Sequence, residues 1–142
     1  MSSIADELAA ISEEMALLPD WEERIAFIIE MARSLEPLQE TERNEETRVR
    51  GCVSRVWLVT DPADSAGKLH FRGDSDAHLV RGEIALLLRI FSGRAPQEIL
   101  SIDPKDVFEQ LGLKDALTMQ RSNGLFSMMN RIQAEARRAS AS

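Results

Sequence analysis

The segment from His78 to Phe91 constrains the fold more than any other part of the chain, because apolar residues occupy nearly every side of a helical pattern. These residues are Leu79, Val80, Ile84, Leu86, Leu87, Leu88, Ile90 and Phe91. A helix that is apolar almost all round is stable only when other elements cover it. The chain has 142 residues, of which 44% are hydrophobic, so one domain spanning residues 1–142 can supply that cover. The sequence therefore predicts a central, buried helix that ends at Gly93.

Further helices are predicted on both sides of this segment. A first helix, followed by Pro19, has an apolar stripe of Ile4, Leu8, Ile11, Met15 and Leu18. Asp20 and Glu23 form a capping-box pattern for a second helix that ends near Leu35, with a stripe of Ile25, Ile28, Ile29 and Ala32. Pro96 and Pro104 each suit the first position of a short helix. Thr118 is the expected cap of a final helix, whose stripe is Leu125, Met128, Met129 and Ile132.

Two short segments before the central helix are typical of β-strands. Residues 56–59 are β-branched and aromatic, and residues 68–72 alternate between apolar and polar side chains. The turn-forming residues 61–67 separate them, which predicts an antiparallel hairpin. Because strands and helices are segregated along the chain, the predicted class is α+β, with a helical layer packed on a small antiparallel sheet. Gly82 and Gly124 lie inside helical patterns, where either close packing or a local break of the helix is the expected reason.

Cys52 is the only cysteine in the chain, so it can form neither an internal disulfide nor a four-sulfur zinc site. Gly51 allows a tight turn just before it, and Arg48, Arg50 and Arg55 flank it. Nearby cations favour a thiolate, which predicts an activated nucleophile. The alternative is an inert cysteine that packs as a small hydrophobic residue. The local pattern leaves both interpretations open.

Charge and composition exclude several functional classes. The net charge of −7 argues against a nucleic-acid-binding protein, which needs a basic surface. No segment approaches the length of a membrane span, no export signal is visible at the N-terminus, and the single unpaired cysteine suits a reducing cytoplasm. No phosphate-binding loop or dinucleotide fingerprint occurs. His70 is expected on the outward face of a strand and His78 at a helix start, so neither suggests a metal site.

Three charged residues stand out beside the cysteine segment. Asp74 and Asp76 precede the central helix, where Asp76 is the expected N-cap. Arg121 lies in the first turn of the final helix, where a cation is electrostatically unfavourable. We therefore expect Arg121 to pair with an anion, and we hypothesise that it supports the Cys52 loop together with Asp74 or Asp76.

Four short motifs together resemble the SufE family of sulfur-acceptor proteins, which includes CsdE. They are Val49-x-Gly51-Cys52-x-Ser54-x-Val56-Trp57-Leu58, Phe71-x-Gly73-Asp74-Ser75-Asp76-Ala77 with Val80-x-Gly82, Phe108-x-x-Leu111-Gly112-Leu113, and Arg121-Ser122-Asn123-Gly124-Leu125. The segment Asp20-Trp21-Glu22-Glu23-Arg24 also fits the family's early helix. The resemblance covers roughly residues 15–137, which makes it far more specific than one motif.

The resemblance implies a fold like that of the scaffold protein IscU and a role in iron–sulfur cluster assembly. Cys52 is then the acceptor that takes persulfide sulfur from a cysteine desulfurase of the SufS or CsdA kind. It passes this sulfur to an iron–sulfur scaffold protein and stimulates the desulfurase. Such a protein is an accessory that carries a covalent persulfide rather than an enzyme. It has no cofactor or metal of its own, since the pyridoxal phosphate belongs to the desulfurase.

The residues also suggest how such a thiol is protected, and they leave two alternatives. Val53, Trp57 and Leu58 are expected to form an apolar wall that shelters the persulfide, with the sulfur turned partly inward at rest. A thiol-based redox sensor would share an accessible, activated cysteine, and a plain interaction module would carry a structural one. Self-association as a homodimer is left open by the sequence.

Overall fold

The computed structural model describes residues 3–52, 54–113 and 119–141, with side chains from residue 123 onward in the last range. Two helices, α1 (Ile4–Ala16) and α2 (Trp21–Met31), come first and are followed by the short 3₁₀ turns η1 (Ala32–Ser34) and η2 (Glu40–Glu42). The hairpin of β1 (Val56–Asp61) and β2 (His70–Ser75) follows, and then α3 (His78–Phe91). The chain continues through α4 (Pro96–Leu100), α5 (Pro104–Gln110) and α6 (Met119–Ser140). This order confirms the predicted α+β class.

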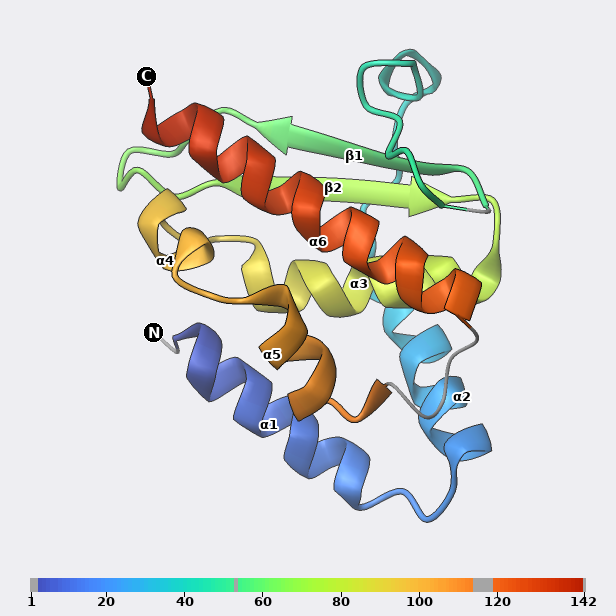
Figure 1. Cartoon of the computed structure of the whole chain (residues 1–142). Coiled ribbons are helices and arrows are strands. Elements are labelled where there is room, and N and C mark those ends of the chain that lie inside the picture. The colour runs from blue at the N-terminus through green and yellow to red at the C-terminus, as the bar shows by residue number, and fades with distance from the viewer. Residues whose placement is uncertain (1–2, 53, 114–118, 142) are drawn as a thin grey trace.

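Helix α3 is the buried centre of the molecule, as its sequence predicts. Figure 1 shows α3 beneath the hairpin, with α6 crossing in front and α1 and α2 below. The buried residues of α3 are Gly82, Glu83, Ile84, Ala85, Leu86, Leu87, Ile90 and Phe91. The predicted stripe of α6 is buried against the same core, as are Ile4, Leu8, Ile11 and Met15 of α1, whereas Leu18 lies beyond the end of α1 and is only partly buried. The main favourable contribution to folding is thus the burial of apolar side chains where helices cover α3 and one face of the sheet.

Helix α2 differs from the prediction because Ile28 is its only buried residue, whereas Ile29 is 38% exposed. The cause is the close approach of the α2 and α3 backbones at Gly82. A Cβ atom at Gly82 would lie 2.3 Å from the carbonyl oxygen of Ile28. Trp21, Phe27 and Met31 of α2 pack against the core while partly exposed, and Ile29 lies on a shallow groove beside His78. The expectation that Gly82 serves close packing is confirmed.

The two faces of the hairpin have different roles. Residues directly opposite each other share a face, and the pairs Val56–Ser75 and Leu58–Gly73 belong to the buried face. The other face carries Trp57, Asp74 and Arg72, and residues around η2 cover it. Arg43 stacks on the Trp57 ring at 5.3 Å and donates a hydrogen bond of 2.8 Å to Asp74. These contacts place the start of the cysteine loop against the sheet.

Candidate functional site

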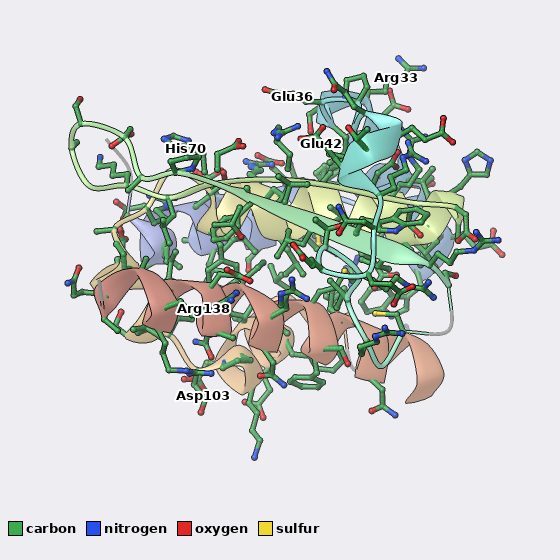
Figure 2. The ribbon with its side chains drawn as sticks, turned by 90° about the horizontal axis from the view of Figure 1, so that it is seen from above. Arg33, Glu36, Glu42, His70, Asp103 and Arg138 are labelled. Carbon is green, nitrogen blue, oxygen red and sulfur yellow. The ribbon has the colours of Figure 1, made fainter. Side chains whose placement is uncertain are left out.

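The loop that bears Cys52 begins as a short addition to the sheet. The amide of Val49 donates to the carbonyl of Val56 at 2.8 Å, and the amide of Leu58 donates to the carbonyl of Thr47 at 2.8 Å. Residues 47–49 therefore run antiparallel to the start of β1 and form a stem. Figure 2 shows the chain passing from η2, which carries Glu42, across the hairpin to the N-terminal half of α6. The tip of the loop thus lies close to α6, the last helix, rather than in open solvent.

Cys52 lies at this tip and is half-buried against α6. Its thiol donates a weak hydrogen bond to the carbonyl oxygen of Gly124, at an Sγ–O distance of 3.6 Å. Gly124 is buried in α6, and a Cβ atom there would lie 3.7 Å from the sulfur. The neighbouring Gly51 has a φ of +88°, a conformation that glycine adopts without strain. Gly51 therefore makes the turn that carries the sulfur onto α6.

The electrostatic surroundings of the thiol differ from the prediction. Burial raises the pKa of Cys52 above its usual value, the carboxylate of Glu83 raises it further, and Arg48 lowers it only in part. Cys52 is consequently a neutral thiol at pH 7 in this docked position. The expectation that flanking arginines activate the sulfur is wrong for this conformation. Arg50 pairs instead with Glu45, and Arg55 pairs with Asp76 at 3.5 Å.

Asp76 fixes the far side of the loop. Its carboxylate accepts a hydrogen bond of 3.1 Å from the amide of Arg55. Helix α3 begins at His78 with Ala77 as its N-cap, and no side chain caps it, so the prediction that Asp76 is the cap is wrong. The reason is that the Asp76 side chain is directed toward the backbone of the loop instead of the helix terminus. Asp76 thus anchors the chain where it leaves the tip and enters β1.

Asp74 has a different environment, since it is 8% exposed and accepts hydrogen bonds from two arginines at 2.8 Å each. These are Arg43, next to η2, and Arg81, in α3. A buried carboxylate is stable only when charged or polar groups compensate it, and here two cations do so. Asp74 therefore ties the segment before the cysteine loop to the sheet and to α3. The side chain of Arg121, and all of Val53 and Thr118, lie outside the described residues.

Sequence reasoning missed two charged residues of the site. Glu83 is 2% exposed in α3 and influences the thiol through its charge. An acidic residue within an otherwise apolar helix is the signal in the sequence that points to it. Arg131 of α6 donates to the carbonyl oxygens of Arg48 and Glu46 at 3.1 Å and 2.5 Å. Its spacing from Cys52 in the sequence gives no indication of this contact.

Across residues 3–52, 54–113 and 119–141, no group of three or more histidine, cysteine, aspartate or glutamate side chains is arranged to hold a metal ion. Within the same part of the chain, no helix combines the length and apolar character needed to cross a bilayer.

Fold and site together define a class of small α+β protein that presents a single cysteine at the tip of a loop docked on a helix. A family model described as "Fe-S metabolism associated domain" matches residues 9–136. The chain belongs to the SufE family, and its domain is one associated with iron–sulfur metabolism. This confirms the resemblance seen in the four sequence motifs.

Individual relatives agree with this assignment. An uncharacterized SufE-like protein of Rhizobium meliloti (strain 1021) is 45% identical over 131 residues, covering 91% of this chain and 94% of the relative. A second SufE-like protein, from Rhizobium etli, is 43% identical over 134 residues, covering 92% and 89%. A solution structure of a hypothetical protein from Thermus thermophilus superposes with a TM-score of 0.78 at 26% identity, covering 96% of this chain and 97% of that one. The fold and family are thus shared over nearly the whole chain.

Proposed function

We propose that this protein accepts and carries sulfur from a cysteine desulfurase, with the Sγ atom of Cys52 as the acceptor. The observation that carries the proposal is the position of Cys52, the only cysteine in the chain, at the tip of a loop whose two ends are fixed. A tip of this kind can extend into the active site of a partner while the body of the protein stays folded. Membership of the SufE family supports the same role.

The proposed reaction is a thiol exchange in which atoms and electrons balance. The Cys52 thiolate attacks the terminal sulfur of a cysteine persulfide on the desulfurase. A new sulfur–sulfur bond forms on Cys52, the persulfide bond of the desulfurase breaks, and the desulfurase cysteine leaves as a thiolate. The proton of the Cys52 thiol passes to solvent or to a base of the partner. The sulfane sulfur then moves by the same exchange to an iron–sulfur scaffold protein.

The resting geometry explains why this exchange needs a partner. In the docked position the pKa of Cys52 is raised, and a neutral thiol is a poor nucleophile. Contacts with the desulfurase would favour an extended tip, in which the sulfur leaves the low-dielectric surroundings of α6 and Glu83. After transfer, return of the tip to Gly124 would shelter the persulfide from other thiols and oxidants. The protein's single cysteine prevents loss of the sulfur through an internal disulfide.

A thiol redox sensor is the second candidate, and the resting position of Cys52 fits it less well. Sensor cysteines react because they are accessible and have a lowered pKa. Burial and the carboxylate of Glu83 instead raise the pKa of Cys52, which is half-buried. A plain interaction module would need no cysteine at the loop tip.

The first test is a mass measurement after incubation with a cysteine desulfurase and free cysteine. The wild-type protein should gain one sulfur atom on Cys52. Cys52→Ser should fold normally and gain none, because a hydroxyl is not ionised at neutral pH. Wild-type protein whose thiol has first been blocked with iodoacetamide is the matched control for a surface effect of the serine. The acceptor role is contradicted if Cys52→Ser still stimulates the desulfurase over many turnovers.

A further inference from the structure

The described part of the cysteine loop, residues 46–52, lies along one face of α6. Gly124, Ser127, Arg131 and Glu135 are separated by three or four residues, so they lie on the same side of the helix. Gly124 touches Cys52, and a Cβ atom on Gly51 would lie 2.5 Å from the Oγ atom of Ser127. The tip and the stem of the loop therefore contact successive turns of a single helix.

Arg131 makes the polar contacts between this helix face and the stem. Its Nη1 donates to the carbonyl oxygen of Arg48 at 3.1 Å, and its Nη2 donates to that of Glu46 at 2.5 Å. Its Nε donates to the Glu135 carboxylate at 3.0 Å, one turn further along α6. The Arg131 side chain is 25% exposed and that of Glu135 is 12% exposed. The planar guanidinium thus bridges two carbonyls while the carboxylate fixes its orientation.

The pattern of backbone bonds explains why these two carbonyls need a donor. The carbonyl of Thr47 and the amide of Val49 bond to β1, so this edge of the stem faces the sheet. In an extended segment, alternate carbonyls point to opposite sides. The carbonyl of Arg48 consequently faces away from β1, toward α6, and the carbonyl of Glu46, in the turn before the bridge, is directed to the same side chain, so Arg131 supplies the donors for both. The stem is held between the sheet on one side and Arg131 on the other.

We propose that Arg131 is a positioning residue for Cys52, which it keeps docked on Gly124 by fixing the stem to α6, with Glu135 orienting the guanidinium. The inference rests on the proposed acceptor function for its purpose. With the stem fixed at Glu46 and Arg48, Cys52 extends and returns to the same place. Without Arg131, the stem is held by β1 alone, and the thiol spends more time away from α6.

The test is the rate at which iodoacetamide alkylates the free protein, which reports on one site because Cys52 is the only cysteine. Arg131→Ala should react about tenfold faster, since two charge-assisted hydrogen bonds to the stem are lost. Arg131→Lys should fall between wild type and Arg131→Ala, because one ammonium group cannot reproduce the planar bridge. The matched control is Arg137→Ala, which removes the same charge from an exposed position of α6 and should leave the rate unchanged.

The pH dependence of alkylation separates positioning from a simple charge effect. Burial and Glu83 raise the pKa of the docked thiol, and Arg48 opposes them, so release from α6 should move the midpoint of the profile to lower pH in Arg131→Ala. Loss of a nearby cation without release would move it to higher pH. A midpoint that stays or rises, or an alkylation rate equal to that of Arg137→Ala, overturns the proposal.

A second variant keeps the test decisive if Arg131→Ala does not fold. Glu135→Gln leaves the arginine in place but weakens its orientation, and it should accelerate alkylation by a smaller factor than the full deletion. An unchanged rate in Glu135→Gln, with Arg131→Ala unfolded, would show that Arg131 is needed for folding only. Since alkylation needs no desulfurase, a failure of sulfur acceptance would leave these rates untouched, and the two proposals can fail separately.

Discussion

In the proposed acceptor role, the sulfur atom of Cys52 must be protected at rest and reactive during transfer. The docked thiol is half-buried, and its pKa is raised first by burial and then by Glu83. Both effects depend on position, because they vanish when the sulfur moves away from α6 and α3. Reactivity is therefore governed by where the tip lies rather than by a fixed cationic neighbour. Arg50 and Arg55 are directed to nearby carboxylates, and Arg48 offsets the rise in the Cys52 pKa only in part, so burial is the dominant influence.

A substitution at Gly51 tests whether the position of the loop tip governs the reactivity of Cys52. Gly51→Ala should undock the tip, because alanine at φ +88° costs about 1–2 kcal/mol and its Cβ would meet the Oγ of Ser127 at 2.5 Å. We expect faster alkylation of Cys52. Adding Ser127→Ala should restore part of the slow rate, since the Oγ contact disappears while the strain in φ remains. The control is Gly67→Ala, at φ +78° in the hairpin turn with no atom within 4 Å, which should leave the rate unchanged. Wild-type alkylation in Gly51→Ala would contradict the prediction.

At the scale of elements, two helical glycines have opposite environments and should respond oppositely to alanine. At Gly82 a Cβ atom would lie 2.3 Å from the Ile28 carbonyl oxygen. This oxygen belongs to the backbone, so it cannot move aside by a change of rotamer as a side-chain atom can. Gly82→Ala should lower the free energy of unfolding by about 2–3 kcal/mol through overpacking. Gly124→Ala meets Cys52 at an ordinary 3.7–3.9 Å and should raise it by up to about 1 kcal/mol through helix propensity.

Urea denaturation of both variants and wild type measures these free energies. The pair controls for the chemical change, since each adds one methyl group to a helical glycine. Equal effects of the same sign would show that propensity, not the α2–α3 approach, decides the outcome.

The helices and strands could be predicted from the sequence because burial of one face imposes a regular spacing on the apolar residues. The stripes of α1 and α6 follow the helical repeat, and Leu69 and Phe71 alternate with the exposed His70 as a half-buried strand requires. The position of Ile29 could not be predicted, since it depends on how closely two backbones approach at Gly82. The same applies to Glu83 and Arg131, whose effects on the loop arise only when α3 and α6 pack beside it. Family motifs indicated Cys52, but its resting pKa required the tertiary contacts.

At the scale of the whole molecule, ion pairs join segments that lie far apart in the sequence. Arg89 of α3 pairs with Glu7 and Glu14 of α1 at 2.5 Å and 2.9 Å. Arg72 of β2 pairs with Glu42 of η2 and with Asp61 of β1. The arginine holds the pKa of Glu42 down to about 2, and Arg89 likewise lowers the pKa of Glu14. A chain with net charge −7 thus places carboxylates against the cations that connect its layers.

These pairs give the folded state an acid sensitivity whose sign follows from the lowered pKa values. A carboxylate with a lower pKa in the folded state stabilises the fold above its unfolded pKa and loses that contribution as pH falls through the folded value. The ordinary pKa of a glutamate is 4.5, so the stabilisation from Glu14 begins to be lost below that pH. Because the Glu14 side chain is 43% exposed, Glu14→Gln should lower the free energy of unfolding at about pH 7 by only about 0.5 kcal/mol and flatten its decrease toward about pH 3.

The neighbouring exposed Glu13 offers the matched control, since Glu13→Gln makes the same change in charge on the same helix. Urea midpoints of the three proteins across this pH range provide the comparison, and parallel curves for Glu14→Gln and Glu13→Gln would mean that net charge, not the contact between α1 and α3, governs the acid response.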